Sequence, residues 1–164
     1  MTHRLEVLKE LEKVWPLEQG SVLELGAGNT KDFQKRFSHL DWKCTDYDED
    51  RADMMNLFYP KNSYDAVFSC HAFEHITDPL KALKEMARVS RKYVVIATPY
   101  HCYHQVLGAD DDHYFVLTDL QMERLLKTAG MRKVYCYTAK ADDRTEQFWN
   151  LITVAEVENE NSSS

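Results

Sequence analysis

A strand that breaks at two glycines constrains this chain more than any other feature. Residues 21–25 form a hydrophobic run, and Gly26 and Gly28 follow it before a helix-compatible segment. A second short strand, residues 42–45, ends at Asp46, which brings a carboxylate to the same edge of a parallel sheet. Because glycine has no Cβ, the backbone there can approach a ligand closely. This layout predicts a nucleotide-like ligand across the strand ends, with a carboxylate for ribose hydroxyls.

Strands and helices alternate along most of the chain, which predicts an α/β fold. We expect a Rossmann-like, mostly parallel sheet with helices on both faces, closed by two antiparallel strands at residues 134–138 and 149–157. The length of 164 residues fits one domain, which we place at residues 1–157. The polar residues 158–164 are expected to form a disordered tail.

Composition narrows the choice of partners and compartment. The net charge of −7 argues against nucleic acid as the main partner, because phosphate binding needs clustered lysine and arginine. No apolar run is long enough to span a bilayer, and the charged residues 1–13 do not resemble a signal peptide. The four cysteines are scattered singly, which is typical of reduced thiols. These features predict a cytoplasmic protein that does not enter the membrane.

The spacing Glu24-x-Gly26-x-Gly28 resembles motif I of the class I S-adenosylmethionine-dependent methyltransferases. Five further segments resemble later parts of that family, in the family's order. They are residues 64–69 (YDAVFS), 71–79 (HAFEHITDP), 82–89 (ALKEMARV), 93–99 (YVVIATP) and 118–131 (TDLQMERLLKTAGM). Together these segments resemble the small-molecule (type 11) methyltransferases most closely. The family usually has a helix and a third strand where residues 46–64 leave barely enough room, so a compact variant with a shortened segment is expected.

The resemblance implies S-adenosylmethionine as the cofactor. Charge agrees with this, since an acidic residue near the glycine loop suits the sulfonium cation and would repel a phosphate. An alternative is an NAD-dependent oxidoreductase. Against it, Asn29 and Thr30 stand where a dinucleotide-binding loop has its last glycine.

The cofactor site of the family carries over to particular positions of this sequence. Residues 26–29 would hold the methionine portion, Asp46 the ribose hydroxyls and Asp53 the adenine amino group. The full set of implied cofactor contacts is Glu24, Gly26, Ala27, Gly28, Asn29, Asp46, Tyr47, Asp53, Met54 and Cys70.

Several of these positions also have a purely structural interpretation. Glu24 could be a strand-end carboxylate that caps backbone groups, and Asp53 could be a solvated turn residue. Tyr47 and Met54 could pack on the adenine face or belong to the core.

Methyl transfer from a sulfonium needs an aligned nucleophile and exclusion of water, and a base only if the nucleophile carries a proton. His71 is the candidate for base or substrate contact, because imidazole titrates near neutral pH; it could equally be a polar residue that lines a cleft.

We expect no metal site. His71, Glu74 and His75 could share one face of a helical turn, with ligation suited to zinc or iron. Glu74 and His75 are better explained as anchors of the turn before residues 78–79.

Aromatic and imidazole side chains crowd the loop after the fifth family strand, which in this fold covers the acceptor pocket. The candidate substrate contacts are Tyr100, His101, His104 and His113. They suit a planar or phenolic acceptor, although a hydrogen-bonded lid explains them as well. The predicted function is therefore methyl transfer to an unidentified small-molecule acceptor. The alternative from another class is an S-adenosylmethionine-binding module without turnover, whose protein partner completes the acceptor pocket.

Overall fold

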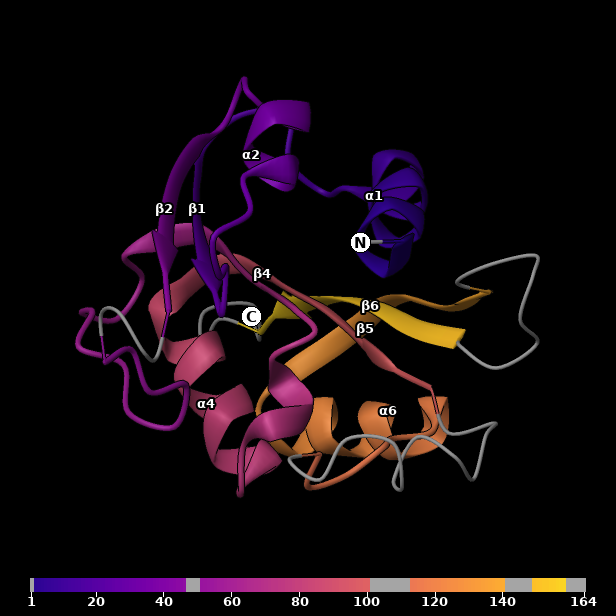
Figure 1. The fold of residues 1–164 in the computed structure, drawn as a ribbon. Coiled ribbons are helices and arrows are strands. Elements are labelled where there is room, and N and C mark those ends of the chain that lie inside the picture. Colours follow the sequence, from indigo (N-terminus) through magenta and orange to yellow (C-terminus); the bar gives the residue numbers. More distant parts are fainter. Residues whose placement is uncertain (1, 47–50, 101–112, 141–148, 159–164) are drawn as a thin grey trace.

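The computed structural model describes residues 2–46, 51–100, 113–140 and 149–158. They form a six-stranded sheet with the order β2-β1-β3-β4-β6-β5 (Figure 1). The strands are β1 (Ser21–Leu25), β2 (Asp41–Thr45), β3 (Tyr64–Cys70), β4 (Ser90–Pro99), β5 (Met131–Lys140) and β6 (Trp149–Val157). Strands β2, β1, β3 and β4 are parallel, whereas β6 pairs antiparallel with β4 and β5. The predicted α/β class with a mostly parallel, Rossmann-like sheet is confirmed.

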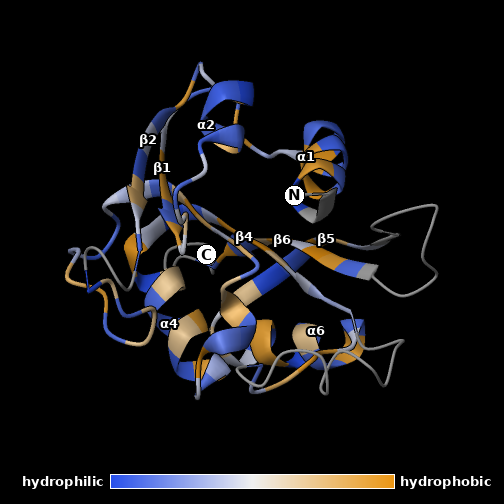
Figure 2. Cartoon of the chain, viewed as in Figure 1, coloured by the Kyte–Doolittle hydropathy of each residue, from blue (hydrophilic) through white to orange (hydrophobic). Residues whose placement is uncertain are grey.

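Helices cover both faces of the sheet, as the sequence predicts. Helices α1 (Thr2–Val14) and α2 (Asp32–Arg36) lie on one face, and α4 (Pro79–Val89) and α6 (Asp119–Thr128) lie on the other (Figure 1). Each face has its own core, because successive residues of a strand point to opposite sides. Within β3, Phe68 joins the core beside α1 and α2, whereas Val67 joins the core beside α4 and α6. Figure 2 shows the hydrophilic residues of α1 on its outer side.

Local sequence sets where the helices begin. The Asp78 side chain accepts a hydrogen bond from a backbone N–H in the first turn of α4, and Pro79 occupies the first helical position. Helix α6 begins with a capping box, in which Thr118 and Gln121 each accept a hydrogen bond from the other's backbone N–H. Helix α2, which follows the glycine loop, has only five residues.

The connection between β2 and β3 is short, as expected, and its described residues (46 and 51–63) contain no strand. Helix α4 holds this connection in place. Glu85 accepts a hydrogen bond from the Leu57 N–H (2.9 Å), and Arg88 donates to the Leu57 carbonyl (2.9 Å). Two charged side chains of α4 thereby satisfy backbone groups that a sheet ladder would otherwise pair.

The last described residue closes the sheet onto α6. The Glu158 N–H donates to the Gly130 carbonyl (3.1 Å), and the rest of the predicted tail lies outside the described residues. Among the helices that the structure describes, none has the length and apolar character needed to cross a membrane.

Candidate cofactor and acceptor pocket

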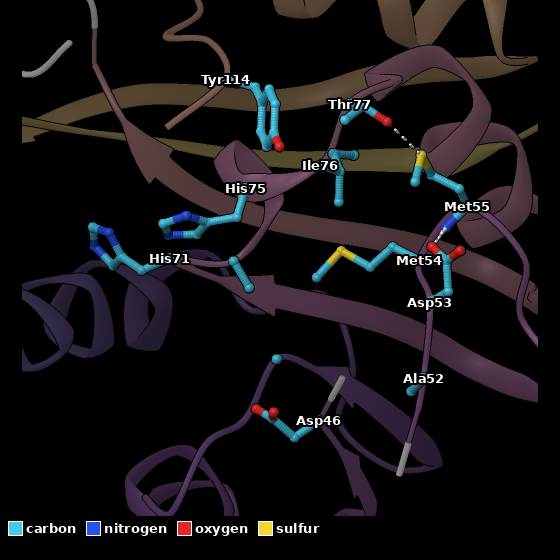
Figure 3. Close-up of a pocket in the computed structure, with 12 residues that line it drawn as sticks. Asp46, Ala52, Asp53, Met54, Met55, His71, His75, Ile76, Thr77 and Tyr114 are labelled. Carbon is cyan, nitrogen blue, oxygen red and sulfur yellow. Dashed lines mark hydrogen bonds between the residues drawn. The ribbon is translucent and has the colours of Figure 1, made fainter. Parts of the chain in front are cut away.

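A cavity of about 510 Å³ lies at the carboxyl ends of β1, β2 and β3. Small-molecule sites typically have volumes of about 300–1,000 Å³. Figure 3 shows His71 and His75 on one side of the cavity and Asp53 on the opposite side. The lining residues are Gly26, Asp46, Ala52, Asp53, Met54, Met55, His71, Ala72, His75, Ile76, Thr77 and Tyr114. Residues from separate predicted motifs therefore share one cavity.

Gly26 is required by packing as well as by backbone conformation. Its φ is +70°, in the left-handed region that favours glycine. A Cβ at this position would lie 2.3 Å from the Cβ of Ala72, so any larger residue would push apart the ends of β1 and β3. The N–H groups of Gly26 and Ala27 both donate to the Thr45 carbonyl (3.0 and 3.1 Å). The glycine thus lets neighbouring strand ends meet, a role that the sequence analysis did not assign to it.

Asp46 lies between two hollows at the end of β2. Its Oδ2 accepts a hydrogen bond from the Gly28 N–H (3.0 Å), which ties the glycine loop to this strand end. Asp46 also lines a second hollow of about 330 Å³, together with Ala27, Gly28 and Asn29. The loop residues predicted to hold the methionine portion are therefore divided, with Gly26 on the larger cavity and the others on the second hollow.

Asp53 and Met54 line the side of the cavity where the resemblance places adenine. Asp53 Oδ1 accepts a hydrogen bond from the Met55 N–H (2.8 Å), drawn as a dashed line in Figure 3. Asp53 is therefore a turn residue and a cavity residue at once. Met54 is buried in the core beside α4 and also contributes to the cavity wall.

Glu24 and Cys70 do not line the cavity, which differs from the expectation for both residues. Glu24 is a buried carboxylate whose Oε1 accepts a hydrogen bond from the Arg4 guanidinium of α1 (2.8 Å). Burial raises the pKa of Glu24, and the Arg4 charge opposes that shift. Cys70 is buried in the core beside α1 and α2, and burial raises the pKa of its thiol. We therefore leave both residues out of the proposed cofactor contacts.

His71 follows β3 and lines the end of the cavity opposite Asp53 (Figure 3). Its φ is +52°, a conformation that is uncommon for a residue other than glycine and that clusters at functional sites. The His71 N–H donates to the Ala97 carbonyl (2.9 Å), which fixes the backbone at this point. Its Nδ1 lies 3.5 Å from Oε1 of Glu74 in the 3₁₀ turn η1 (Phe73–His75).

A segment distant in the sequence reaches the same end of the cavity. The Tyr114 N–H donates to the Glu74 carbonyl (2.9 Å), and the rings of Phe73 and Phe115 pack edge to face with centroids 5.6 Å apart. These contacts bring His113 Nε2 to 4.0 Å from Glu74 Oε1. Tyr114 itself lines the cavity.

Of the predicted acceptor contacts, the structure describes Tyr100 and His113. Tyr100 packs against the core beside α4 and α6 and forms an isolated bridge with Leu117, and it is not among the residues that line the cavity. His113 lies next to the cavity, because it precedes Tyr114 and its ring packs against that of His75, and both of these residues line the cavity. The remaining candidates, His101, His104 and the cofactor candidate Tyr47, lie outside the described residues.

The sequence profile of a family described as "Methyltransferase domain" matches residues 23–98, from β1 through the glycine loop to β4. Over these residues the chain resembles the class I S-adenosylmethionine-dependent methyltransferases. No curated protein matches this chain by sequence.

Solved structures share the methyltransferase fold at low sequence identity. A chain of the complex between the Haloferax volcanii Trm112 methyltransferase activator and a methyltransferase is 16% identical, with a TM-score of 0.74 over 96% of this chain and 90% of that chain. A Bacillus halodurans methyltransferase is 12% identical, with a TM-score of 0.71 over 93% and 99%. An Aquifex aeolicus S-adenosylmethionine-dependent methyltransferase is 17% identical, with a TM-score of 0.69 over 96% and 94%. At these identities the likeness shows the fold alone.

Several lining residues were not predicted from the sequence. Ile76 and Thr77 offered a signal, because a short turn between a strand end and a helix cap must lie at the carboxyl edge of the sheet. His75 was considered as an anchor of that turn and as a possible metal ligand, but not as a cavity residue. Ala52 and Met55 offered no comparable signal, since their place depends on how α4 holds the preceding connection.

Proposed function

We propose that the protein transfers the methyl group of S-adenosylmethionine to a small-molecule acceptor. One observation carries this proposal: a single cavity is lined by Gly26 and Asp46 at the strand ends and also by His71 and Tyr114. A cofactor that spans the strand ends would direct its methyl group toward the imidazole and phenol side chains. The family match supports the same reaction.

The cavity wall suits a cationic nucleoside. Asp46 would accept hydrogen bonds from the ribose hydroxyls, and Asp53 with Met54 would contact the adenine ring. Carboxylates at Asp46 and Asp53 favour a sulfonium cation and disfavour the pyrophosphate of NAD. This charge pattern is the reason to rank methyl transfer above the oxidoreductase alternative.

The acceptor end supplies what an in-line displacement needs. The acceptor's nucleophilic atom forms a bond to the methyl carbon, the carbon–sulfur bond breaks with its electron pair left on sulfur, and S-adenosylhomocysteine is the product. If the nucleophile carries a proton, His71 would take it, since this imidazole lines the cavity. The catalytic role of His71 rests on this placement.

Binding of S-adenosylhomocysteine tests the cofactor assignment directly. We expect titration calorimetry to show binding to the full chain, and thermal stabilisation by S-adenosylhomocysteine but not by NAD. Asp46→Ala should weaken binding by about 1–3 kcal/mol, the scale of a lost charged hydrogen bond. The matched control is Asp41→Ala, an exposed carboxylate at the other end of β2, which should bind normally. Stabilisation by NAD alone would overturn the proposal, and unchanged affinity in Asp46→Ala would remove that residue from the ribose role.

A protein partner that completes the acceptor pocket is the second candidate arrangement. It is favoured by the structural likeness to a methyltransferase in complex with a methyltransferase activator. Tight S-adenosylhomocysteine binding with turnover only after a partner is added would support it, whereas turnover by the isolated chain would contradict it. Location in the cytoplasm stays a prediction from the cysteine pattern.

A further inference from the structure

Two imidazoles and one carboxylate cluster beside the acceptor end of the cavity. One potential ligand atom from each of Glu74, His75 and His113 lies within 4.8 Å of the others. His113 Nε2 is 4.0 Å from Glu74 Oε1, and the rings of His75 and His113 have centroids 4.7 Å apart. Ligand atoms around a tetrahedral zinc ion are separated by about 3.3–3.5 Å when the bonds are about 2.0–2.2 Å long. Small side-chain rotations would therefore bring these three atoms to coordinating positions.

The environment of Glu74 points to a cation. Its side chain is only 1% exposed, and Oε2 accepts a hydrogen bond from the Thr98 hydroxyl (3.2 Å). Among the described residues, none donates a hydrogen bond to the other oxygen, Oε1, which lies 3.5 Å from His71 Nδ1 and 4.0 Å from His113 Nε2. A buried carboxylate is costly unless it is hydrogen-bonded, paired or coordinated to a metal. An ion between Oε1 and the imidazoles would provide that compensation.

The backbone holds these residues in position. Glu74 and His75 belong to the single turn η1, and the hydrogen bond from Tyr114 N–H to the Glu74 carbonyl fixes the segment that carries His113. Thr98, on β4, orients the carboxylate from behind. Hydrogen bonds to metal-ligating carboxylates are a regular part of metal sites and affect metal affinity.

We propose that Glu74, His75 and His113 bind one divalent transition-metal ion of the zinc type. Two nitrogen ligands and one oxygen ligand suit zinc and leave a fourth position open. From the sequence no metal site was expected, because Glu74 and His75 were better explained as anchors of the turn before residues 78–79. The set considered there was His71, Glu74 and His75, without His113.

The position of the site suggests what the open position would bind. His75 lines the cavity, so the ion would lie on the wall at the acceptor end. Resting on the proposed methyl transfer, this placement favours an acceptor with a hydroxyl or other oxygen donor, which the ion would hold and polarise. Such an acceptor agrees with the planar or phenolic class suggested by the neighbouring aromatic side chains.

Zinc binding to the full chain tests the site without any acceptor. The protein is stripped with a chelator, titrated with Zn²⁺ and analysed for bound metal, and Co²⁺ is used in parallel because its visible absorption reports the ligands. We expect one ion per chain, and an affinity at least about 10-fold lower in Glu74→Gln, His113→Asn and His75→Asn. His39→Asn, at an exposed imidazole outside the cluster, is the matched control and should bind Zn²⁺ normally.

Thermal unfolding of each metal-free variant separates loss of a ligand from loss of the fold. His75 is exposed, so His75→Asn leaves the core intact even if a buried variant unfolds. The proposal is overturned if Zn²⁺ and Co²⁺ do not bind, or if the three variants bind as tightly as the native chain. S-adenosylhomocysteine affinity is measured on the same samples. Zn²⁺ binding without S-adenosylhomocysteine binding would contradict the proposed function alone, and the reverse result would contradict the metal site alone.

Discussion

Two carboxylates near opposite ends of β3 have different surroundings. Asp65, near the amino end, accepts hydrogen bonds from the Ser21 N–H (2.9 Å) and from Nε and Nη2 of Arg91 (both 3.1 Å). Glu74, just beyond the carboxyl end, accepts a hydrogen bond from the Thr98 side chain, and no residue in the described part of the chain donates to its second oxygen. Yet Glu74 is the more deeply buried of the two, with 1% of its side chain exposed against 16% for Asp65.

The difference separates a structural carboxylate from a carboxylate at a site. Hydrogen bonds from Arg91, assisted by those from Ser21, hold the pKa of Asp65 well below its usual range, so its charge stabilises the folded sheet. Glu74 accepts fewer hydrogen bonds than Asp65, and its side chain is less exposed to solvent. Folded proteins retain such an incompletely hydrogen-bonded carboxylate where another group is to bind. The free energy of unfolding should therefore depend strongly on the charge of Asp65 and only weakly on that of Glu74.

The largest effect is expected at a third carboxylate, Glu24, which has a single strong cationic partner. Arg4→Met would leave this buried charge uncompensated and remove the guanidinium that lies 4.8 Å from the centre of the Phe33 ring. Removing one partner of a buried ion pair costs about 3–5 kcal/mol, which urea unfolding should detect as a lower midpoint.

The double variant Arg4→Met with Glu24→Gln is the control for that result. It should recover much of the lost stability, because neither charge remains. Lys9→Met, which breaks a surface pair with Glu6, should change stability by no more than about 1 kcal/mol. Equal losses in Arg4→Met and Lys9→Met would show that Glu24 does not depend on its partner.

Asp65→Asn should have the next largest effect. The amide keeps the shape of the side chain but loses the charged hydrogen bonds to Arg91, which are worth about 1.5–3 kcal/mol. Because the pKa of Asp65 is lowered by folding, its contribution is present above a pH of about 4 and disappears as pH falls below that value. Urea unfolding should thus give free energies for the native chain and Asp65→Asn that converge in acid. A constant difference across pH would contradict this account.

Thr98→Val should produce a smaller loss, of about 1–2 kcal/mol, by removing the hydroxyl that donates to Glu74. The matched control is Thr45→Val. Its buried hydroxyl donates to the neutral Glu24 carbonyl (3.2 Å), and its loss should cost less. The double variant Thr98→Val with Glu74→Gln should lose less free energy of unfolding than Thr98→Val alone, as measured by denaturant unfolding.

Glu74→Gln alone should have the smallest effect on the metal-free protein. Replacing a buried, incompletely hydrogen-bonded carboxylate by a neutral amide should change the free energy of unfolding by less than about 1 kcal/mol, in either direction. Thermal unfolding in chelator measures this directly. A loss as large as that of Asp65→Asn would mean that Glu74 is a structural carboxylate like Asp65, and that the contrast between them is wrong.

Much of the fold could be predicted because its signals are local. The caps at Asp78 and Thr118 act within one helical turn. Successive residues of β3 point to opposite faces of the sheet, so Val67 and Phe68 enter different cores regardless of which helices cover those faces. The alternation of strands and helices along the chain then predicted the mostly parallel sheet. The site was less predictable, because residues 26–29 proved to be divided between two hollows.

The sequence by itself determined the α/β class, the two cores, the helix starts and the glycine turn, since each depends on residues a few positions apart. Only the tertiary structure decided that Arg4 would neutralise Glu24 and that Gly26 would meet Ala72. It also decided that His113 would reach Glu74, 39 positions earlier in the chain. These contacts join residues far apart in the sequence. They depend on how helix α1 packs on the sheet and on which strand ends meet at one edge, and no short segment of sequence determines either arrangement.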